Sequence, residues 1–389
     1  MMSEFQYYEW LALDRSLNAA QLAEVKRLSS HMDRVTSTNA SVSYSYGDFN
    51  HDPLDVLARY FDVFFYHANW GTKTVAFRFS SDVIKRAAIE PYLIKHCVEL
   101  EQRRDFWILS ITLETENDYA WIREEDEAAS AADIAGVRRQ IAQGDYRALY
   151  LMWLAKIQEH HDEFSDDEDY DEDYDEDYES EEDIGEAPPL PADLKNLDAA
   201  LNRFCKFFAI DANLVAAAAQ QSAQKKEPSR SEMKAAIASL SRKECDDFLL
   251  QLLDDQSSLS DRLRQRLGLT SNAPHTVSKS AEQLLQDARV FAAEGKRRAE
   301  AQARAARIKE LKALAAREDE IWKEVDRLIA KKTTKSRDDA VHLISELHHL
   351  AQYRLTLDVF MARVRDVVER SGRSRALISR LKKSSIDYA

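Results

Sequence analysis

The chain has 389 residues, 44% of them hydrophobic, which is enough for two or three domains that each bury a core. Its net charge of −15 comes from one stretch: residues 162–186 hold 17 acidic and no basic side chains, and the rest of the chain carries about +2. Cys97, Cys205 and Cys245 lie far apart and form no Cys-x-x-Cys pair, which argues against a disulfide framework.

Targeting and membrane patterns are also missing from the sequence. No basic segment followed by an apolar core marks the N-terminus, and no apolar run approaches the roughly 18 residues of a membrane span. We therefore predict a cytoplasmic protein without a membrane partner.

The first 120 residues alternate between strand and helix patterns. Aromatic and alternating apolar segments predict strands, and apolar residues at helical spacing predict helices. The predicted strands are residues 5–13, 34–46 and 74–79, and the predicted helices are residues 17–30, 54–67 and 81–88. Residues 97–101 and 106–113 flank a polar tetrapeptide and predict a hairpin. Residues 1–120 are thus predicted to form an α+β domain, a small mixed sheet with helices.

Residues 121–161 predict a helical extension that leads into the acidic run. The run contains Asp-Glu-Asp-Tyr three times in succession, ending at Tyr170, Tyr174 and Tyr178. Because its like charges repel and it buries little apolar surface, residues 162–191 predict an acidic disordered linker. Two roles stay open: a solvating linker, or an inhibitory strap that occupies a basic groove. The three tyrosine rings can pack on a partner and are candidate contact residues.

Helical patterns fill the chain after the run. Residues 192–278 predict a helical subdomain, and residues 279–389 predict a long helix followed by a helical hairpin. Residues 280–332 hold one Gly and no Pro, which predicts one continuous helix. Its apolar stripe is Leu311, Leu314, Ile321, Val325 and Leu328. The stripe covers little more than two heptads, so a coiled coil and self-association through this helix stay open. The second half is therefore predicted to be all-α.

Several phrases of the sequence resemble one bacterial family. They are YYEWLALDR (7–15), YGDFNHDP (46–53), YFDVFFYHANWGTK (60–73) and GDYRALYLMWL (144–154), together with the Pro-rich segment and helices of 188–253 and the terminal hairpin of 337–381. The family consists of bacterial hypothetical proteins associated with genes for SWIM-type zinc-finger and helicase-like proteins. The resemblance implies a bacterial cytoplasmic protein in a nucleic-acid-linked system, and it supplies no catalytic residues.

The sequence carries no recognised motif for catalysis, cofactor binding or metal binding. The sequence contains no phosphate-binding Gly-rich loop, dinucleotide fingerprint or nucleophile elbow, and it has only eight Gly. Asp48, His51 and Asp52 lie close together, but Asp52 fits better as a helix cap than as a metal ligand. We therefore predict no catalytic, cofactor-binding or metal-binding residues and a protein that is not an enzyme. An unrecognised site in the α+β domain stays open.

The first candidate partner-binding site is the phrase that precedes the strand at 74–79. Asn69 and Thr72 could present polar groups to a partner on either side of Trp70. The structural alternative is that Asn69 ends the preceding helix, Gly71 takes a positive φ and Trp70 packs.

The second candidate site is the basic side of the long helix, which includes Arg297, Arg298, Arg304 and Arg307. Residues 279–389 hold 25 basic and 17 acidic side chains, so this end of the chain carries about +8. Contact with nucleic-acid phosphates is one interpretation and a solvated charged helix is the other, because Glu300 and Glu310 interrupt the patch.

These patterns predict a non-enzymatic protein–protein interaction scaffold or regulatory component of a bacterial multi-protein system, with a protein partner and no cofactor. The alternative is a nucleic-acid-associated accessory protein whose acidic run masks its basic C-terminal helix.

Overall fold

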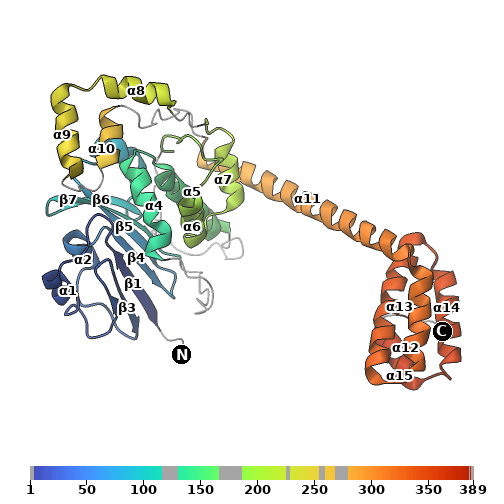
Figure 1. Ribbon diagram of the computed structural model, residues 1–389. Helices are drawn as coiled ribbons and strands as arrows, with labels where there is room; N and C mark the ends of the chain where they lie inside the picture. Colours follow the sequence, from blue (N-terminus) through green and yellow to red (C-terminus); the bar gives the residue numbers. More distant parts are fainter. Residues whose placement is uncertain are drawn as a thin grey trace, which may run out of the picture. The chain divides into compact units, whose positions relative to one another are not determined.

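The computed structural model describes residues 4–115, 130–165, 186–224, 228–253, 259–267, 279–384 and 386. The chain divides into two compact units, Met1–Ala292 (unit 1) and Ala293–Ala389 (unit 2). The predicted order, an α+β part followed by an all-α part with a long helix, is confirmed (Figure 1). Most of the acidic run, including Tyr170, Tyr174 and Tyr178, lies outside the described residues.

Unit 1 is built on a seven-stranded sheet with the strand order β2-β3-β1-β4-β5-β7-β6. The strands are β1 (Phe5–Leu11), β2 (Met32–Val35), β3 (Asn39–Ser45), β4 (Val63–Ala68), β5 (Lys73–Ser80), β6 (Val98–Arg103) and β7 (Phe106–Leu113). Every neighbouring pair is antiparallel, so the sheet is larger than predicted and is antiparallel rather than mixed. The predicted hairpin at 97–113 is confirmed as β6 and β7.

Two element predictions in this part are wrong. Residues 34–46 form two strands, β2 and β3, instead of one, because the chain turns between Val35 and Asn39. The predicted helix at 54–67 ends at Tyr60, as α2 (Pro53–Tyr60), and its second half is β4. Strand β4 is buried on both faces of the sheet, so its apolar residues run continuously, and such a run has no strand periodicity.

Two shorter helices complete the sheet region. They are α1 (Ala19–Val25), where a longer helix was predicted, and α3 (Arg86–Ile89), which is followed by the 3-10 turn η1 (Glu90–Tyr92). The predicted cap of α2 is confirmed, because Asp52 Oδ1 accepts a hydrogen bond from the backbone N–H of Leu54 at 2.8 Å.

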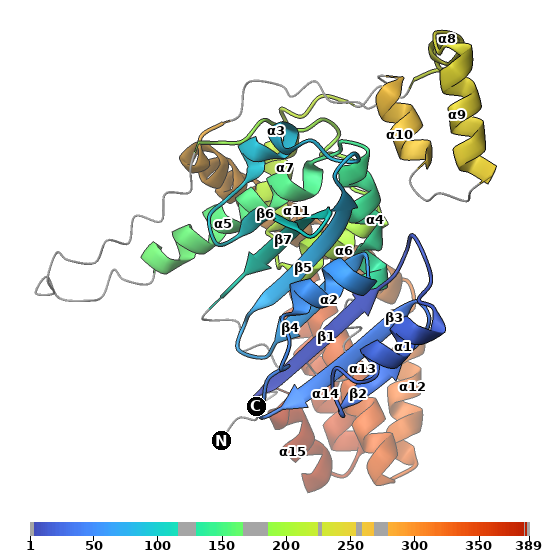
Figure 2. The ribbon, with the colours of Figure 1, turned by 90° about the vertical axis from the view of Figure 1, so that its left-hand side faces the viewer.

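A separate apolar core lies on each face of the sheet, because successive strand residues point to opposite faces. Trp10 and Phe64 belong to one core, which α1 and α2 cover. Phe65 and Phe77 belong to the other, larger core. Four helices cover that second face: α4 (Ala131–Ala142), α5 (Arg147–Ser165), α6 (Ala199–Phe207) and α7 (Ala212–Ala219) (Figure 2).

Helices on both sides of the acidic run share this second core. Helices α4 and α5 precede the run and α6 and α7 follow it, yet Trp153 and Phe204 are buried in the same cluster. Helices α4 and α6 cross closely at Gly136, where an added Cβ would lie 2.8 Å from Cβ of Ala200. We expected the run to separate two folded halves, but unit 1 contains the chain on both sides of it.

Hydrogen bonds fix the segment that follows the run onto the same unit. Tyr92 Oη donates to the backbone O of Pro189 at 2.9 Å, and Ser222 Oγ donates to that of Pro191 at 2.8 Å. The buried Arg147, at the start of α5, donates from Nη1 to the backbone O of Asn196 at 2.9 Å. The segment after the run is therefore part of unit 1 and not of a separate domain.

Three short helices follow α7 in unit 1: α8 (Arg230–Ala238), α9 (Arg242–Leu253) and α10 (Leu259–Arg266). Helices α9 and α10 lie side by side (Figure 2). Helix α11 (Ala281–Ala315) comes next; Leu284 and Ala288 in its first turns pack in unit 1, and Leu311 packs in unit 2.

Unit 2 is a helical bundle of α12 (Glu318–Ala330), α13 (Thr334–Arg354), α14 (Leu357–Arg370) and α15 (Arg375–Lys383) with the last turns of α11. The predicted long helix is confirmed as α11, but it does not extend to residue 330, because the chain breaks between α11 and α12 at Ala316 and Arg317. The predicted stripe is confirmed as the packed face, since Leu311, Ile321, Val325 and Leu328 are buried and Leu314 is partly buried. None of the described helices is long and apolar enough to cross a membrane.

Candidate interaction surfaces

The predicted site at Asn69, Trp70 and Thr72 forms the turn between β4 and β5. The three residues do lie together, but two of them support the turn. Asn69 Oδ1 accepts a hydrogen bond from the backbone N–H of Phe5 at 2.9 Å, and Thr72 Oγ1 accepts one from Trp70 Nε1 at 3.0 Å. Asn69 follows a strand, not the helix we predicted. Trp70 is 38% exposed, so its ring is the part of this turn that a partner could contact.

Gly71 in the same turn has a structural role. Its φ is +104°, and an added Cβ would lie 2.0 Å from the backbone O of Thr115. Only glycine fits a positive φ together with such a close backbone approach. The turn is therefore built for close packing against the end of β7.

The arginines of α11 are only partly free to contact a partner. Arg298 forms an ion pair with Glu294 at 3.2 Å, and Arg307 pairs with Glu310 at 3.1 Å. The other two predicted contact residues, Arg297 and Arg304, are exposed and form no ion pair with the described residues. Half of the predicted patch is thus neutralised within its own unit.

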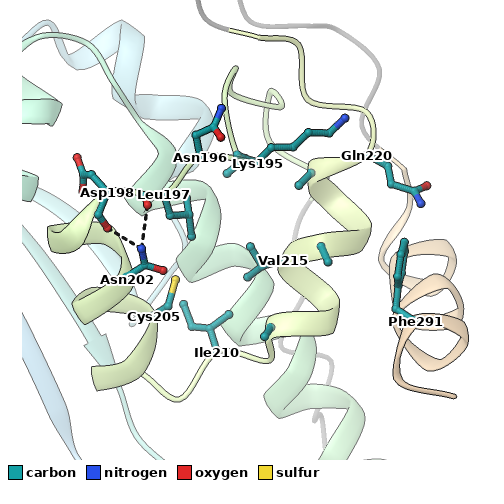
Figure 3. Close-up of a pocket in the computed structure, with 14 residues that line it drawn as sticks. Lys195, Asn196, Leu197, Asp198, Asn202, Cys205, Ile210, Val215, Gln220 and Phe291 are labelled. Atoms are coloured by element: carbon teal, nitrogen blue, oxygen red, sulfur yellow. Dashed lines mark hydrogen bonds between the residues drawn. The ribbon is translucent and has the colours of Figure 1, made fainter. Parts of the chain in front are cut away.

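A pocket of about 910 Å³ lies between α6, α7 and the segment before α6 (Figure 3). Ile210, Val215 and Cys205 give it an apolar lining. Burial raises the pKa of the Cys205 thiol to about 11, so the thiol stays protonated near neutral pH and is a poor nucleophile. Asn202 Nδ2, on the pocket rim, donates to the backbone O of Leu197 at 2.8 Å. The pocket therefore combines an apolar lining with two charged side chains at its edge, Lys195 and Asp198.

A buried ion pair joins β5 to the turn before β4. Arg78 and Asp62 are 4% and 0% exposed, and Arg78 Nη2 lies 2.7 Å from Asp62 Oδ1. Burial by itself raises the pKa of Asp62, but Arg138, Arg78 and two backbone N–H donors outweigh it, so this pKa lies below its usual value. Every charge here has a partner, which is typical of a structural network.

His67 is a second buried polar side chain on the sheet. Its ring lies among those of Phe5, Tyr7 and Phe65, with centroids 5.4–6.1 Å away. Its Nδ1 has no hydrogen-bond partner among the described residues. Burial, with a smaller effect of Lys73, lowers its pKa to about 4. The ring is therefore neutral at pH 7. No cluster of three or more metal-ligand side chains is found in the described part of the chain.

The sequence did not predict the apolar surface of α8 and α9. Neither helix has a buried residue among those described. Near the end of α9, Leu252 is 63% exposed, and Leu249, Leu250 and Leu253 are 58%, 60% and 81% exposed. The last three of these side chains share one face, because residues three and four apart are neighbours on a helix. We call them the α9 leucine surface.

The opposite side of α9 already has a neighbour. Arg266 of α10 forms an ion pair with Glu244 of α9 at 2.6 Å, and Phe248 is half-buried on this side. Leu252, four residues after Phe248 on this same side, is 63% exposed, so the contact with α10 covers only the first part of α9. The sequence signal for these exposed leucines is FLLQLL (248–253), a segment that is apolar around the whole helix, which is typical of a helix covered on both sides.

Comparisons of the chain with protein-family models, curated proteins and solved structures found no match. The resemblance to a bacterial family therefore stays a prediction.

Proposed function

We propose that this protein is a non-enzymatic adaptor that binds a partner protein through the α9 leucine surface. The observation that carries this proposal is the exposure of three neighbouring leucines on one helix face. Exposed apolar patches with a polar edge are typical of protein interaction sites.

The shape and charge of this surface favour a helical partner segment. Leu249, Leu250 and Leu253 form an apolar ridge that an amphipathic helix can cover along its length. Asp246 and Asp247 lie one turn earlier on the same helix; Asp246 pairs with Arg242 at 3.1 Å, and Asp247 is exposed. A partner helix that carries Lys or Arg beside its apolar face would therefore complement the acidic edge of the surface.

A crosslinking experiment tests the proposal. A photo-reactive amino acid at position 250 should crosslink, in the native host, to an apolar helical segment of another protein. That purified partner should bind the wild-type chain, and the variant L250E/L253E should bind at least ten-fold more weakly. The matched control is A235E/A238E, which adds the same charge at exposed positions of the neighbouring α8. It should bind like the wild type.

Two outcomes would overturn the proposal. One is crosslinking only to other copies of this chain, which would make the surface a self-association site. The other is an equal loss of binding in both variants, which would assign the effect to net charge.

A further inference from the structure

One end of the unit 2 bundle concentrates positive charge. Helices α12, α13 and α14 follow one another through short turns and pack as hairpins, so the turns at 331–333 and 371–374 lie at the same end. Residues 331–339 and 371–383 hold nine Lys and Arg and only two Asp. Because unit 2 has 23 basic and 15 acidic residues in all, this end supplies most of its net charge.

Contacts within unit 2 hold the two segments together. Arg380 Nε of α15 lies 2.5 Å from Asp338 Oδ1 in the first turn of α13. Leu377 and Leu381 of α15 are buried in the same core as Val341 of α13. Figure 1 shows α15 at the end of the bundle opposite the end that α11 joins. The topology thus brings together basic side chains that are some forty residues apart in sequence.

Most of the cations at this end are exposed and have no ion-pair partner in the described part of the chain. Six of them are exposed and form no ion pair with the described residues: Lys331, Lys332, Lys335, Arg375, Lys382 and Lys383. We call these six residues the basic end. One of the two acidic residues nearby, Asp338, is paired with Arg380, so it does little to offset them.

The backbone at both turns is consistent with a use for these side chains. Lys332 and Arg373 have φ values of +59° and +52°, in the left-handed region where glycine or asparagine is less strained. Lys332 belongs to the basic end, whereas Arg373 pairs with Glu369 at 3.9 Å. Strained backbone positions such as that of Lys332 often serve recognition.

We propose that the basic end binds the phosphate backbone of duplex nucleic acid. Clustered cations of one sign match the close spacing of phosphates on a duplex. The described residues of the two segments include no aromatic side chain to stack on bases, so contact is with the backbone and is independent of sequence. They also include no large exposed apolar side chain, which a membrane-surface site ordinarily uses as an anchor.

This site differs from the arginines of α11. Arg298 and Arg307 are paired with acidic neighbours, whereas no member of the basic end is. The inference goes beyond the adaptor function, because it concerns another unit of the chain and stands whether or not α9 binds a partner.

Binding of a fluorescent 25-base-pair DNA duplex of mixed sequence to the full chain tests the proposal. The test variant is K332E/K335E/K382E/K383E, and the matched control is K296E/R297E/R304E/K309E on α11, which changes the net charge equally. Wild-type affinity should fall steeply as salt rises from about 50 mM. The test variant should bind at least ten-fold more weakly, with a salt slope smaller by about 3 to 4 for four lost phosphate contacts. The control should lose less than three-fold.

Four results would overturn the proposal. Absence of duplex binding by the wild type at about 50 mM salt would remove the site altogether. Equal losses in the two variants would show an effect of net charge, and a loss confined to the control would move the site to α11. Anionic lipid vesicles serve as a second probe. Binding to vesicles that depends on the basic end, without duplex binding, would identify a membrane surface as the target. Circular dichroism of each variant confirms that it is folded.

Discussion

At the scale of single residues, a few buried polar side chains stabilise unit 1 through specific hydrogen bonds and ion pairs. Asp62 accepts hydrogen bonds from the backbone N–H groups of Leu13 and Asp14, at 2.7 and 2.9 Å, in addition to its ion pair with Arg78. One carboxylate therefore joins β1, β4 and β5. Breaking a buried pair on one side leaves an uncompensated charge, which costs more than the pair itself contributes.

The substitution Asp62→Asn should accordingly destabilise unit 1 by about 3 to 5 kcal/mol, because Arg78 stays buried without its counter-charge. Urea unfolding measures the change. The double variant D62L/R78M, which removes both charges and keeps apolar volume, should be less destabilised than D62N. If D62N unfolds at the urea concentration of the wild type, the pair has no such role.

His67 should make the stability of unit 1 depend on pH. Its pKa is about 4 in the folded chain and 6.5 in the unfolded chain, so below pH 6.5 the unfolded chain gains a proton that the folded chain does not bind. The free energy of unfolding should thus fall as pH drops from 6.5 towards 4, by about 2 kcal/mol at pH 5 relative to pH 8.

The variants H67F and H67Q cannot titrate and test this directly. Thermal unfolding at pH 8 and pH 5 should show a smaller difference between the two pH values in both variants than in the wild type. A difference that is unchanged in both would assign the pH dependence to other groups.

At the scale of elements, the sequence predicts helices and strands correctly where their apolar residues have a clear period. It fails where a segment is buried on both faces and shows no period. The hairpin at 97–113 was predicted because apolar segments flank a polar tetrapeptide, and the α13–α14 pair was predicted from its helical spacing. Strand β4 was mistaken for a helix because Phe64 and Phe65 face different cores and both are buried. The break at Arg317 was missed because alanines and charged residues on either side favour helix equally.

The packed stripe of α12 can be tested by single substitutions. Val325 is fully buried, so Val325→Asp should destabilise unit 2 by about 3 to 5 kcal/mol through lost burial and an unpaired buried charge. Lys323, two residues earlier, is exposed, and Lys323→Asp should change stability by no more than about 0.5 kcal/mol. Chemical denaturation compares the two variants. Equal effects would mean that the α12 stripe is not the packed face.

At the scale of the whole molecule, the boundary between the two folded units does not lie at the acidic run. The acidic run looked like a domain boundary in the sequence, yet α5 before it and α6 after it are parts of one core. Both candidate surfaces also depend on arrangements that a linear reading misses. The basic end joins two segments only through the hairpin topology of unit 2, and the α9 leucine surface is recognisable only from the exposure of its side chains in the folded chain.

Cleavage within the acidic run should therefore leave the protein associated. A site-specific protease site placed at residues 174–178 should give two fragments on a denaturing gel that elute as one species in native size-exclusion chromatography. They should separate only after addition of denaturant, because the apolar core between α4 and α6 holds them together. Fragments that elute separately without denaturant would show that the run joins two independent domains.

Because both ends of the acidic run belong to unit 1, the length of the run can change without moving the parts it joins. A segment whose two ends are held by one folded unit can lengthen at small cost, since doubling a closed loop costs only about 0.6 kcal/mol. Each further Asp-Glu-Asp-Tyr unit adds three negative charges and no apolar requirement. The number of repeats can therefore set the isoelectric point of the protein while the fold stays the same.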